Sequence, residues 1–391
     1  MRKVKSTTTF KTQLACFALL AIVTLIRCSP ESKEVKYNNS FKPGKICLDT
    51  DSVHINAHGG GILYHHKTYY WFGEFKTAGQ GGNTAQVGVS CYSSTDLYNW
   101  KNEGIALPVS SEPGSDIEKG SVIERPKVIY NEKTGKFVMW FHLELKGQGY
   151  EAARTALAVS NNVTGPYTFV KSLRPNAQEW PFDYPEELKN KAYDTELKWW
   201  TPDWYKAIDE GMFMQRDFEG GQMARDMQLF VDDDGKAYHI HSSEDNLTLH
   251  ISELTDDYQD FTGKYIRIFP GGHNEAPALF KKDGIYYLMA SGCTGWDPNE
   301  ARLFDAKSIW GPWKPLGNPC VGEEAHLTFH SQSTYILPVQ GKKDAFIYMG
   351  DRWTPENPID GRYIWLPIQF DESGKPVINW YDEWNLSIFD N

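Results

Sequence analysis

The pattern of apolar and polar positions returns five times along the chain, at a period of about 40 to 50 residues. Each repeat contains a short polar motif, an apolar run, a turn, an aromatic-rich run, and a segment that closes on an aromatic residue. The length and aromatic content of the aromatic-rich runs predict a buried strand in each repeat. The five runs are residues 68–72, 136–140, 236–240, 285–289 and 345–349.

Turn signals separate the apolar run from the aromatic-rich run. Asp234 and Gly235 follow the apolar run 229–231, and residues 131–135 follow the apolar run 128–130. Asp-Gly and Asn-x-x-x-Gly between alternating apolar runs indicate β-hairpins. Each repeat is therefore a unit of about four strands.

Four-stranded units at this period are the sequence signature of a β-propeller, in which each blade packs its faces against its neighbours. Five units predict an all-β, five-bladed β-propeller over residues 47–391. An ordinary β-sandwich is the alternative, and it is disfavoured because the outer aromatic segment returns in four repeats. A stretch between the second and third units, about 175–223, breaks the period and predicts an inserted, partly helical segment.

The N-terminus has the pattern of a targeting segment. Basic residues precede an apolar run from 14 to 26, which is too short to span a bilayer comfortably. Residues 1–27 resemble a bacterial lipoprotein signal peptide, and 28–46 reads as a flexible tether. Arg27 departs from the small residue that usually precedes the lipidated cysteine. We expect secretion across the inner membrane and an outer-membrane lipoprotein anchored at Cys28, periplasmic or on the cell surface; simple cleavage and secretion is the alternative.

Composition narrows the possible partners. The 391 residues carry a formal net charge of −11, so there is no basic excess to neutralise the phosphates of a nucleic acid. Aromatic residues make up 14% of the chain, a bias that suits stacking on sugar rings. We expect a monomer that acts on a polysaccharide or oligosaccharide. The four cysteines beyond the targeting segment lack metal-ligand spacing, and Cys293 and Cys320 could pair or remain free thiols.

Polar residues at the start of each repeat are the candidates for chemistry, because the innermost strands of a propeller line its central channel. Glu124, Asp226 and Glu275 directly precede apolar strands, where a carboxylate is costly unless it is solvated, paired or functional. Two carboxylates around a sugar-sized pocket are typical of a glycosidase, in which one must stay protonated to donate to the leaving oxygen. His58 and Gln332 hold the corresponding positions of the first and fifth repeats.

Longer motifs in every repeat carry a family resemblance. They are residues 57–62 (AHGGGI), 69–74 (YYWFGE), 124–128 (ERPKV), 225–227 (RDM), 231–238 (VDDDGKAY), 275–280 (EAPALF), 331–334 (SQST) and 349–353 (MGDRW). In this order they resemble glycoside hydrolase family 43, and most closely its exo-β-1,3-galactanase branch. The resemblance covers the chain from about residue 47 onward. It implies a five-bladed propeller that hydrolyses glycosidic bonds with inversion.

The resemblance also implies roles for particular residues. Glu275 is similar to the catalytic acid, and Glu124 to a carboxylate that tunes the pKa of that acid. Gln332 matches a Gln that the galactanase branch has in place of the Asp that serves as catalytic base in most of the family. A neutral amide either positions water or acts through an imidic tautomer. The residues expected to contact substrate are Glu74, His58, Asp226, Glu244, Trp296, Asp351, Arg352 and Trp365.

Three alternatives stay open at this stage. The aromatic-rich insertion is interpreted as a wall beside the pocket that alters the accepted sugar, against a solvated decoration on the rim. This interpretation keeps α-L-arabinofuranosidase, an activity also found in family 43, beside hydrolysis of β-1,3-galactan. A catalytically inactive carbohydrate-binding propeller is supported by the missing first-repeat Asp and opposed by Glu124, Glu275 and Gln332. No cofactor or metal ligand is predicted, although the resemblance leaves open a calcium ion on the propeller axis.

Overall fold

The computed structural model describes residues 37–84 and 87–390. The chain divides into two units, Met1–Lys36 and Tyr37–Asn391, and the first lies outside the described residues. The predicted signal peptide and the predicted lipidation site Cys28 therefore fall outside them as well. Across the described part of the chain, no helix has both the length and the apolar character needed to cross a bilayer.

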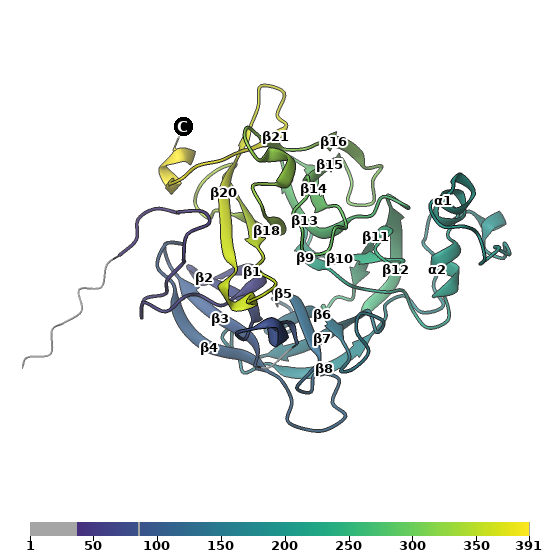
Figure 1. Ribbon diagram of the computed structural model, residues 1–391, viewed down its shortest axis with the longest axis horizontal. Coiled ribbons are helices and arrows are strands. Elements are labelled where there is room, and N and C mark those ends of the chain that lie inside the picture. The colour runs from purple at the N-terminus through teal and green to yellow at the C-terminus, as the bar shows by residue number, and fades with distance from the viewer. Residues whose placement is uncertain (1–36, 85–86, 391) are drawn as a thin grey trace, which may run out of the picture. The chain divides into compact units, whose positions relative to one another are not determined.

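Five sheets surround a central axis in the second unit (Figure 1). Blades 1 to 3 contain β1 (His58–His65), β2 (Thr68–Phe75), β3 (Gly88–Ser94), β4 (Lys101–Pro108); β5 (Val122–Asn131), β6 (Lys136–Glu144), β7 (Arg154–Ser160), β8 (Thr168–Leu173); and β9 (Met227–Val231), β10 (Ala237–Ser243), β11 (Thr248–Leu254), β12 (Phe261–Ile268). Blades 4 and 5 contain β13 (Glu275–Lys282), β14 (Ile285–Ser291), β15 (Arg302–Ala306), β16 (Lys314–Gly317); and β18 (Gln332–Pro338), β19 (Phe346–Arg352), β20 (Arg362–Phe370), β21 (Pro376–Asn379) with β17 (Cys320–Val321). The first strands of successive blades contact one another, and β1 meets β18 to close the ring. The predicted five-bladed propeller is confirmed.

Helical segments are short throughout the described residues. The two α-helices both belong to the predicted insertion, which is partly helical as expected. The helical segments are α1 (Pro202–Asp209), α2 (Met212–Arg216) and the 3-10 turns η1 (Gln80–Asn83), η2 (Glu186–Leu188), η3 (Ala325–Leu327), η4 (Pro358–Asp360) and η5 (Leu386–Phe389).

The aromatic-rich runs form the second strand of every blade. In β6 every residue after Lys136 is buried, because neighbouring blades cover both faces of the sheet. The predicted hairpin turns are present: the Gly135 N–H donates to the Asn131 carbonyl at 2.8 Å, and the Gly235 N–H donates to the Asp232 carbonyl at 2.9 Å. Both glycines have positive φ, 68° and 81°, which a residue with a Cβ adopts only with strain.

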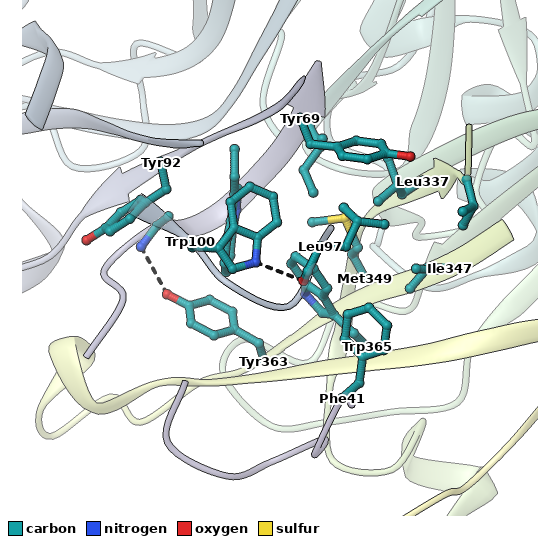
Figure 2. Close-up of a cluster of buried hydrophobic side chains, with 14 of the residues drawn as sticks. Phe41, Tyr69, Tyr92, Leu97, Trp100, Leu337, Ile347, Met349, Tyr363 and Trp365 are labelled. Carbon is teal, nitrogen blue, oxygen red and sulfur yellow. Dashed lines mark hydrogen bonds between the residues drawn. The ribbon is translucent and has the colours of Figure 1, made fainter. Parts of the chain in front are cut away.

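A cluster of aromatic residues joins the last blade to the first (Figure 2). Trp365 of β20 lies 4.8 Å from Trp71 of β2 and meets Trp100 edge-on at 6.0 Å, measured between ring centroids. The Trp100 indole N–H donates to the Leu97 carbonyl at 3.0 Å, so its polar atom is satisfied inside the cluster. This packing closes the ring between blades that lie at opposite ends of the sequence.

Residues 37–46 belong to the propeller rather than to a tether, which corrects the boundary expected from the sequence. Phe41 is buried in the closing cluster and stacks on Trp384 with ring centroids 4.3 Å apart. The two residues also exchange backbone hydrogen bonds of 2.7 and 3.1 Å. The Phe41 side chain packs beside Trp365, and this contact holds the segment against the propeller. The sequence does not reveal the contact, because the residues around Phe41 are mostly polar.

Trp365→Ala is expected to lower the free energy of unfolding by about 3–5 kcal/mol, since it empties a large volume inside the closing cluster. Urea denaturation followed by tryptophan fluorescence measures the change. Trp365→Phe keeps part of the ring contact and is expected to lose less. Unfolding free energy close to that of the unchanged protein for Trp365→Ala would contradict a structural role for this ring.

Candidate functional site

Four of the five first strands are irregular at the same end. The register slips between His58 and Gly61 in β1, Glu124 and Lys127 in β5, Glu275 and Ala278 in β13, and Ser333 and Tyr335 in β18. Arg125 and Ala276 lie within two of these slips with positive φ of 55° and 53°. A bulge takes a side chain out of the strand's alternation, which lets Glu124 and Glu275 face the axis while the strand beyond them packs normally.

A cavity of about 300 Å³ opens at this end of the first strands. Residues from four of the blades' first strands or their leading loops meet there, together with residues from the second strands. The predicted site residues that line it are Glu74, Glu124, Asp226, Glu275, Trp296 and Gln332. The structure therefore brings the three predicted catalytic side chains to one pocket of a size that suits a monosaccharide unit.

Glu275 is set up to hold a proton near neutral pH. Burial, and then the charge of Asp226, raise its pKa to about 7. Asp226 is fixed beside it, because its Oδ2 accepts the Ala276 N–H at 3.1 Å and pairs with Arg125 Nη2 at 2.9 Å. The side-chain amide of Asn246 donates to Glu275 Oε1 at 2.6 Å.

Glu124 is in the opposite protonation state. Although burial acts to raise its pKa, hydrogen bonds and charge from His142 and a hydrogen bond from Tyr150 hold the pKa at about 2. Tyr150 Oη donates to Oε1 at 2.9 Å, and His142 Nδ1 lies 3.1 Å from Oε2. In this arrangement Asp226 is the carboxylate whose charge raises the pKa of Glu275, and the pKa-tuning role expected for Glu124 stays a prediction.

The hydrogen bonds of Gln332 suit the ordinary amide form. Its Oε1 accepts from Arg125 Nη2 at 2.5 Å and from Trp353 Nε1 at 3.2 Å. Its Nε2 donates to Ser291 Oγ at 3.0 Å. An imidic tautomer would place a proton on the oxygen that these two donors already face, so this arrangement disfavours the imidic form.

A second cavity of about 250 Å³ adjoins the first and shares Gln332, Trp296 and Trp353 with it. Asp351 and Arg352, both expected at the site, line this second cavity. The Gly59 N–H donates to Asp351 Oδ2 at 2.5 Å, and burial raises the Asp351 pKa to about 7. Trp296 is 43% exposed and meets Trp353 edge-on at 5.6 Å, which leaves its indole face available to a ligand.

Three residues expected to bind substrate lie outside both cavities. His58 is fully buried and stacks on Tyr363 with centroids 5.4 Å apart. Glu244 is fully buried and pairs with Arg267 Nε at 2.6 Å. Trp365 belongs to the closing cluster and is 6% exposed. In each case the side chain packs or pairs inside the protein: His58 begins β1, Glu244 lies in the turn after β10, and Trp365 lies within β20.

The structure also corrects the predicted position of the insertion beside the pocket. Neither central cavity has a lining residue between 175 and 223. The segment lies against the outer side of blade 3, where α1 and α2 appear beyond β11 and β12 in Figure 1. Phe182 contacts Trp310 edge-on at 5.2 Å, and the Phe182 N–H donates to the Tyr265 carbonyl at 3.0 Å. The insertion is therefore not a wall of the pocket.

The donor set at the pocket does not fit a metal ion. Within the described residues, one group of three potential ligands lies close together, namely Glu124, His142 and Asp226. Both ring nitrogens of His142 face carboxylates, Glu124 and Glu144, and the pair raises the His142 pKa to about 9 despite burial. A protonated imidazole offers no lone pair to a metal, and Arg125 already neutralises Asp226. The two free thiols Cys293 and Cys320 form no disulfide.

Sequence reasoning missed several residues of the pocket. His142 and Ser291 directly oppose Glu124 and Glu275 across the first two strands of their blades. A signal for them exists, because each follows an aromatic-rich run at the position that Glu74 holds in blade 1. Tyr150, Asn246 and Arg225 come from loops, where no periodicity marks a side chain for the pocket; the residues that were missed also include Lys76, Arg125, Gly295 and Trp353.

Comparison with known proteins places these observations in a family. A family model described as Glycosyl hydrolases family 43 matches residues 194–376. A solved family 43 β-1,3-galactosidase with galactodeoxynojirimycin is 61% identical, with a TM-score of 0.87, over 88% of this chain and 100% of that one. An exo-β-1,3-galactanase from Phanerochaete chrysosporium, solved with β-1,3-galactotriose, is 33% identical, with a TM-score of 0.71, over 89% of this chain and 68% of that one.

Curated relatives are more distant. The β-D-galactofuranosidase of Aspergillus niger is 28% identical over 159 residues, which are 40% of this chain and 45% of that protein. The chain spans about half the length of the curated relatives it matches. The solved structures are therefore similar to more of this chain, and at higher identity, than the β-D-galactofuranosidase is.

Proposed function

The chain belongs to glycosyl hydrolases family 43, and from this premise we propose that it is an exo-acting, inverting O-glycosyl hydrolase that releases galactose from β-1,3-galactan, the backbone of arabinogalactan. The observation that carries the proposal is the pair Glu275 and Asp226 in the central cavity, with the Glu275 pKa raised to about 7. Relatives that act on β-1,3-linked galactose share the fold over nearly the whole propeller. That likeness is the reason for naming this linkage.

Glu275 is the proposed proton donor to the leaving oxygen. A general acid works best when its pKa lies near the operating pH, because it is then both protonated and able to give up the proton. Burial and Asp226 bring Glu275 into that range. Arg125 acts in the opposite direction on the Glu275 pKa, so the guanidinium limits how far the pKa rises.

Gln332 is proposed to position the attacking water. Its oxygen is occupied by Arg125 and Trp353, and its nitrogen keeps one N–H beyond the bond to Ser291. The amide is not the acceptor of the water's proton in this arrangement. Glu124 is the ionised carboxylate of the same cavity, and we assign it to receive that proton, as a weak base whose pKa is about 2.

The alternatives from the sequence lose their main support. The α-L-arabinofuranosidase hypothesis depended on an insertion that walls the pocket, and the insertion lies elsewhere. An inactive binding propeller would have no use for a buried carboxyl whose pKa a second carboxylate raises.

Export with a lipid anchor at Cys28 and a monomeric state remain proposals that rest on the N-terminal sequence and the composition. Metabolic labelling with a radioactive fatty acid tests the anchor, and loss of label in Cys28→Ser is the expected result. Light scattering of the soluble propeller tests the monomer.

Product analysis tests the proposed function directly. The protein is incubated with β-1,3-galactan, arabinogalactan and an aryl α-L-arabinofuranoside, and the products are identified by chromatography. We expect galactose as the product from β-1,3-galactan, appearing first as the α-anomer in NMR spectra because the mechanism inverts. Release of arabinose with no galactose would replace this proposal with the arabinofuranosidase.

Glu275→Gln is expected to lower kcat on β-1,3-galactobiose by about 10²–10⁴-fold, because the leaving sugar needs a proton. An activated aryl β-galactoside leaves without one, so its kcat is expected to fall much less. Steady-state kinetics on both substrates measure the difference. Equal losses on the two substrates would contradict a proton-donor role and indicate damage to the pocket.

Asp226→Asn is expected to shift the pH dependence of kcat/KM. The active form has Glu275 protonated, so activity falls as pH rises through its pKa of about 7. Removing the negative charge of Asp226 lowers that pKa, and the basic limb of the profile moves to lower pH. The Asn side chain can still accept the Ala276 N–H, which makes it the conservative replacement. An unchanged or higher basic limb would rule out this influence of Asp226.

A further inference from the structure

The hairpin between β10 and β11 has an unusual backbone. Its three consecutive residues Glu244, Asp245 and Asn246 all have positive φ, of 52°, 57° and 64°. Residues with a Cβ avoid this left-handed region, and a run of three persists only where surrounding contacts hold it. The insertion contacts this hairpin on one side, and the central cavity lies on the other.

Apolar packing ties the hairpin to the helices of the insertion. Leu247, at the end of the turn, is 2% exposed and belongs to a cluster with Trp204 and Ile208 of α1 and Phe213 of α2. This cluster buries residues from the insertion and from the hairpin only, so the hairpin supplies part of the insertion's own core. The two segments are therefore coupled: a displacement of α1 or α2 leaves Leu247 without its neighbours.

Charged contacts fix the same hairpin. Arg216 of α2 pairs with Asp245 at 2.6 Å. Arg267 of β12 donates to both oxygens of Glu244, at 2.6 and 2.8 Å, and also to the carbonyls of Ile208 and Asp209, at 2.7 and 3.0 Å. Arg267 thus joins the hairpin to the C-terminal end of α1, where carbonyl groups attract a cation.

On the cavity side, the hairpin carries a direct contact to the proposed acid. Asn246 lines the central cavity, and its Nδ2 donates to Glu275 Oε1 at 2.6 Å. The Cys293 thiol donates to the Asn246 carbonyl at 3.7 Å and so holds the backbone at the same point. The charged and titratable groups that face Glu275 are Asp226 before β9, Arg125 of β5 and Cys293 after β14.

We propose that Asn246 is a positioning residue for Glu275 and that the insertion acts on the reaction through it, by holding the hairpin in its left-handed turn. The inference rests on the proposed function, in which Glu275 donates the proton. It gives the insertion a role that needs no contact with substrate. The orientation of the Glu275 carboxyl, rather than the shape of the sugar site, is what the insertion sets.

Two variants test the two halves of the proposal. Asn246→Leu removes the hydrogen bond while keeping a branched side chain of similar outline, and Leu247→Ala weakens the packing between hairpin and insertion. Both are expected to lower kcat on β-1,3-galactobiose about tenfold more than on an aryl β-galactoside, because only the disaccharide needs the positioned proton. Leu157→Ala, a buried leucine of blade 2 outside the site, is the matched control: it lowers stability and leaves this ratio unchanged.

The pH profile supplies a readout that simple destabilisation does not move. The Asn246 donor favours the ionised form of Glu275, so Asn246→Leu is expected to move the basic limb of kcat/KM to higher pH. Combining Asn246→Leu with Leu247→Ala is expected to change the substrate ratio no further than Asn246→Leu alone, because both act on one contact. If Leu247→Ala folds poorly, Arg216→Met breaks the ion pair with Asp245 without emptying the core and takes its place.

The outcomes separate the two proposals. If Glu275→Gln shows the expected dependence on the leaving group while Asn246→Leu and the hairpin variants keep the ratio and pH profile of the unchanged protein, the positioning role is overturned and the proposed function stands. If Asn246→Leu alone changes both readouts, Asn246 positions the acid and the link to the insertion is overturned. If Glu275→Gln shows no such dependence, the proposed function itself fails.

Discussion

The Arg125 guanidinium is the interaction on which the arrangement of the site depends. It extends from the bulge of β5 and reaches Asp226 before blade 3, and Gln332 and the Ser333 carbonyl in blade 5. Its own backbone N–H donates to Glu74 of blade 1 at 2.9 Å. A buried cation costs free energy unless it is paired, and this one is paired with groups from several blades at once. The first strands of these blades must therefore keep their positions relative to one another, so that Arg125 stays paired with its partners near the axis.

The bulges explain how strands that pack as ordinary sheets can also present functional groups. In a regular strand successive side chains point to opposite faces of the sheet, so Glu124 and Glu275 would point into the space between two blades. The left-handed residues Arg125 and Ala276 break that alternation for one step only. Because Pro126 and Pro277 come directly after these residues, the chain has no backbone N–H to place at the start of the regular ladder. Chemistry and packing are thus separated along a single strand.

The repeat pattern is what made the fold and the pocket predictable. Glu124, Glu275 and Gln332 could be found because the first strand of each repeat has a fixed place in a propeller, and a polar residue at its start stands out against an apolar run. The same reasoning failed for Trp365 and Glu244. Trp365 lies within β20 and Glu244 in the turn after β10, and the sequence does not show whether such an aromatic or ionisable residue faces the pocket or the interior.

Loop residues set a different limit. Tyr150 and Asn246 reach the pocket from connections whose course depends on contacts made elsewhere in the chain, so no local pattern could identify them. The insertion shows this most clearly. Its tryptophans suggested a sugar-stacking wall, but Trp204 is fully buried in the insertion's own core, and Trp199 and Trp200, which are 50% and 59% exposed, line neither central cavity. A short helical segment needs such a core to stay folded on the edge of a blade, and aromatic side chains bury the most apolar area per residue. Aromatic content in an insertion therefore does not by itself indicate a binding wall, and a role in binding has to come from the residues that line the cavity.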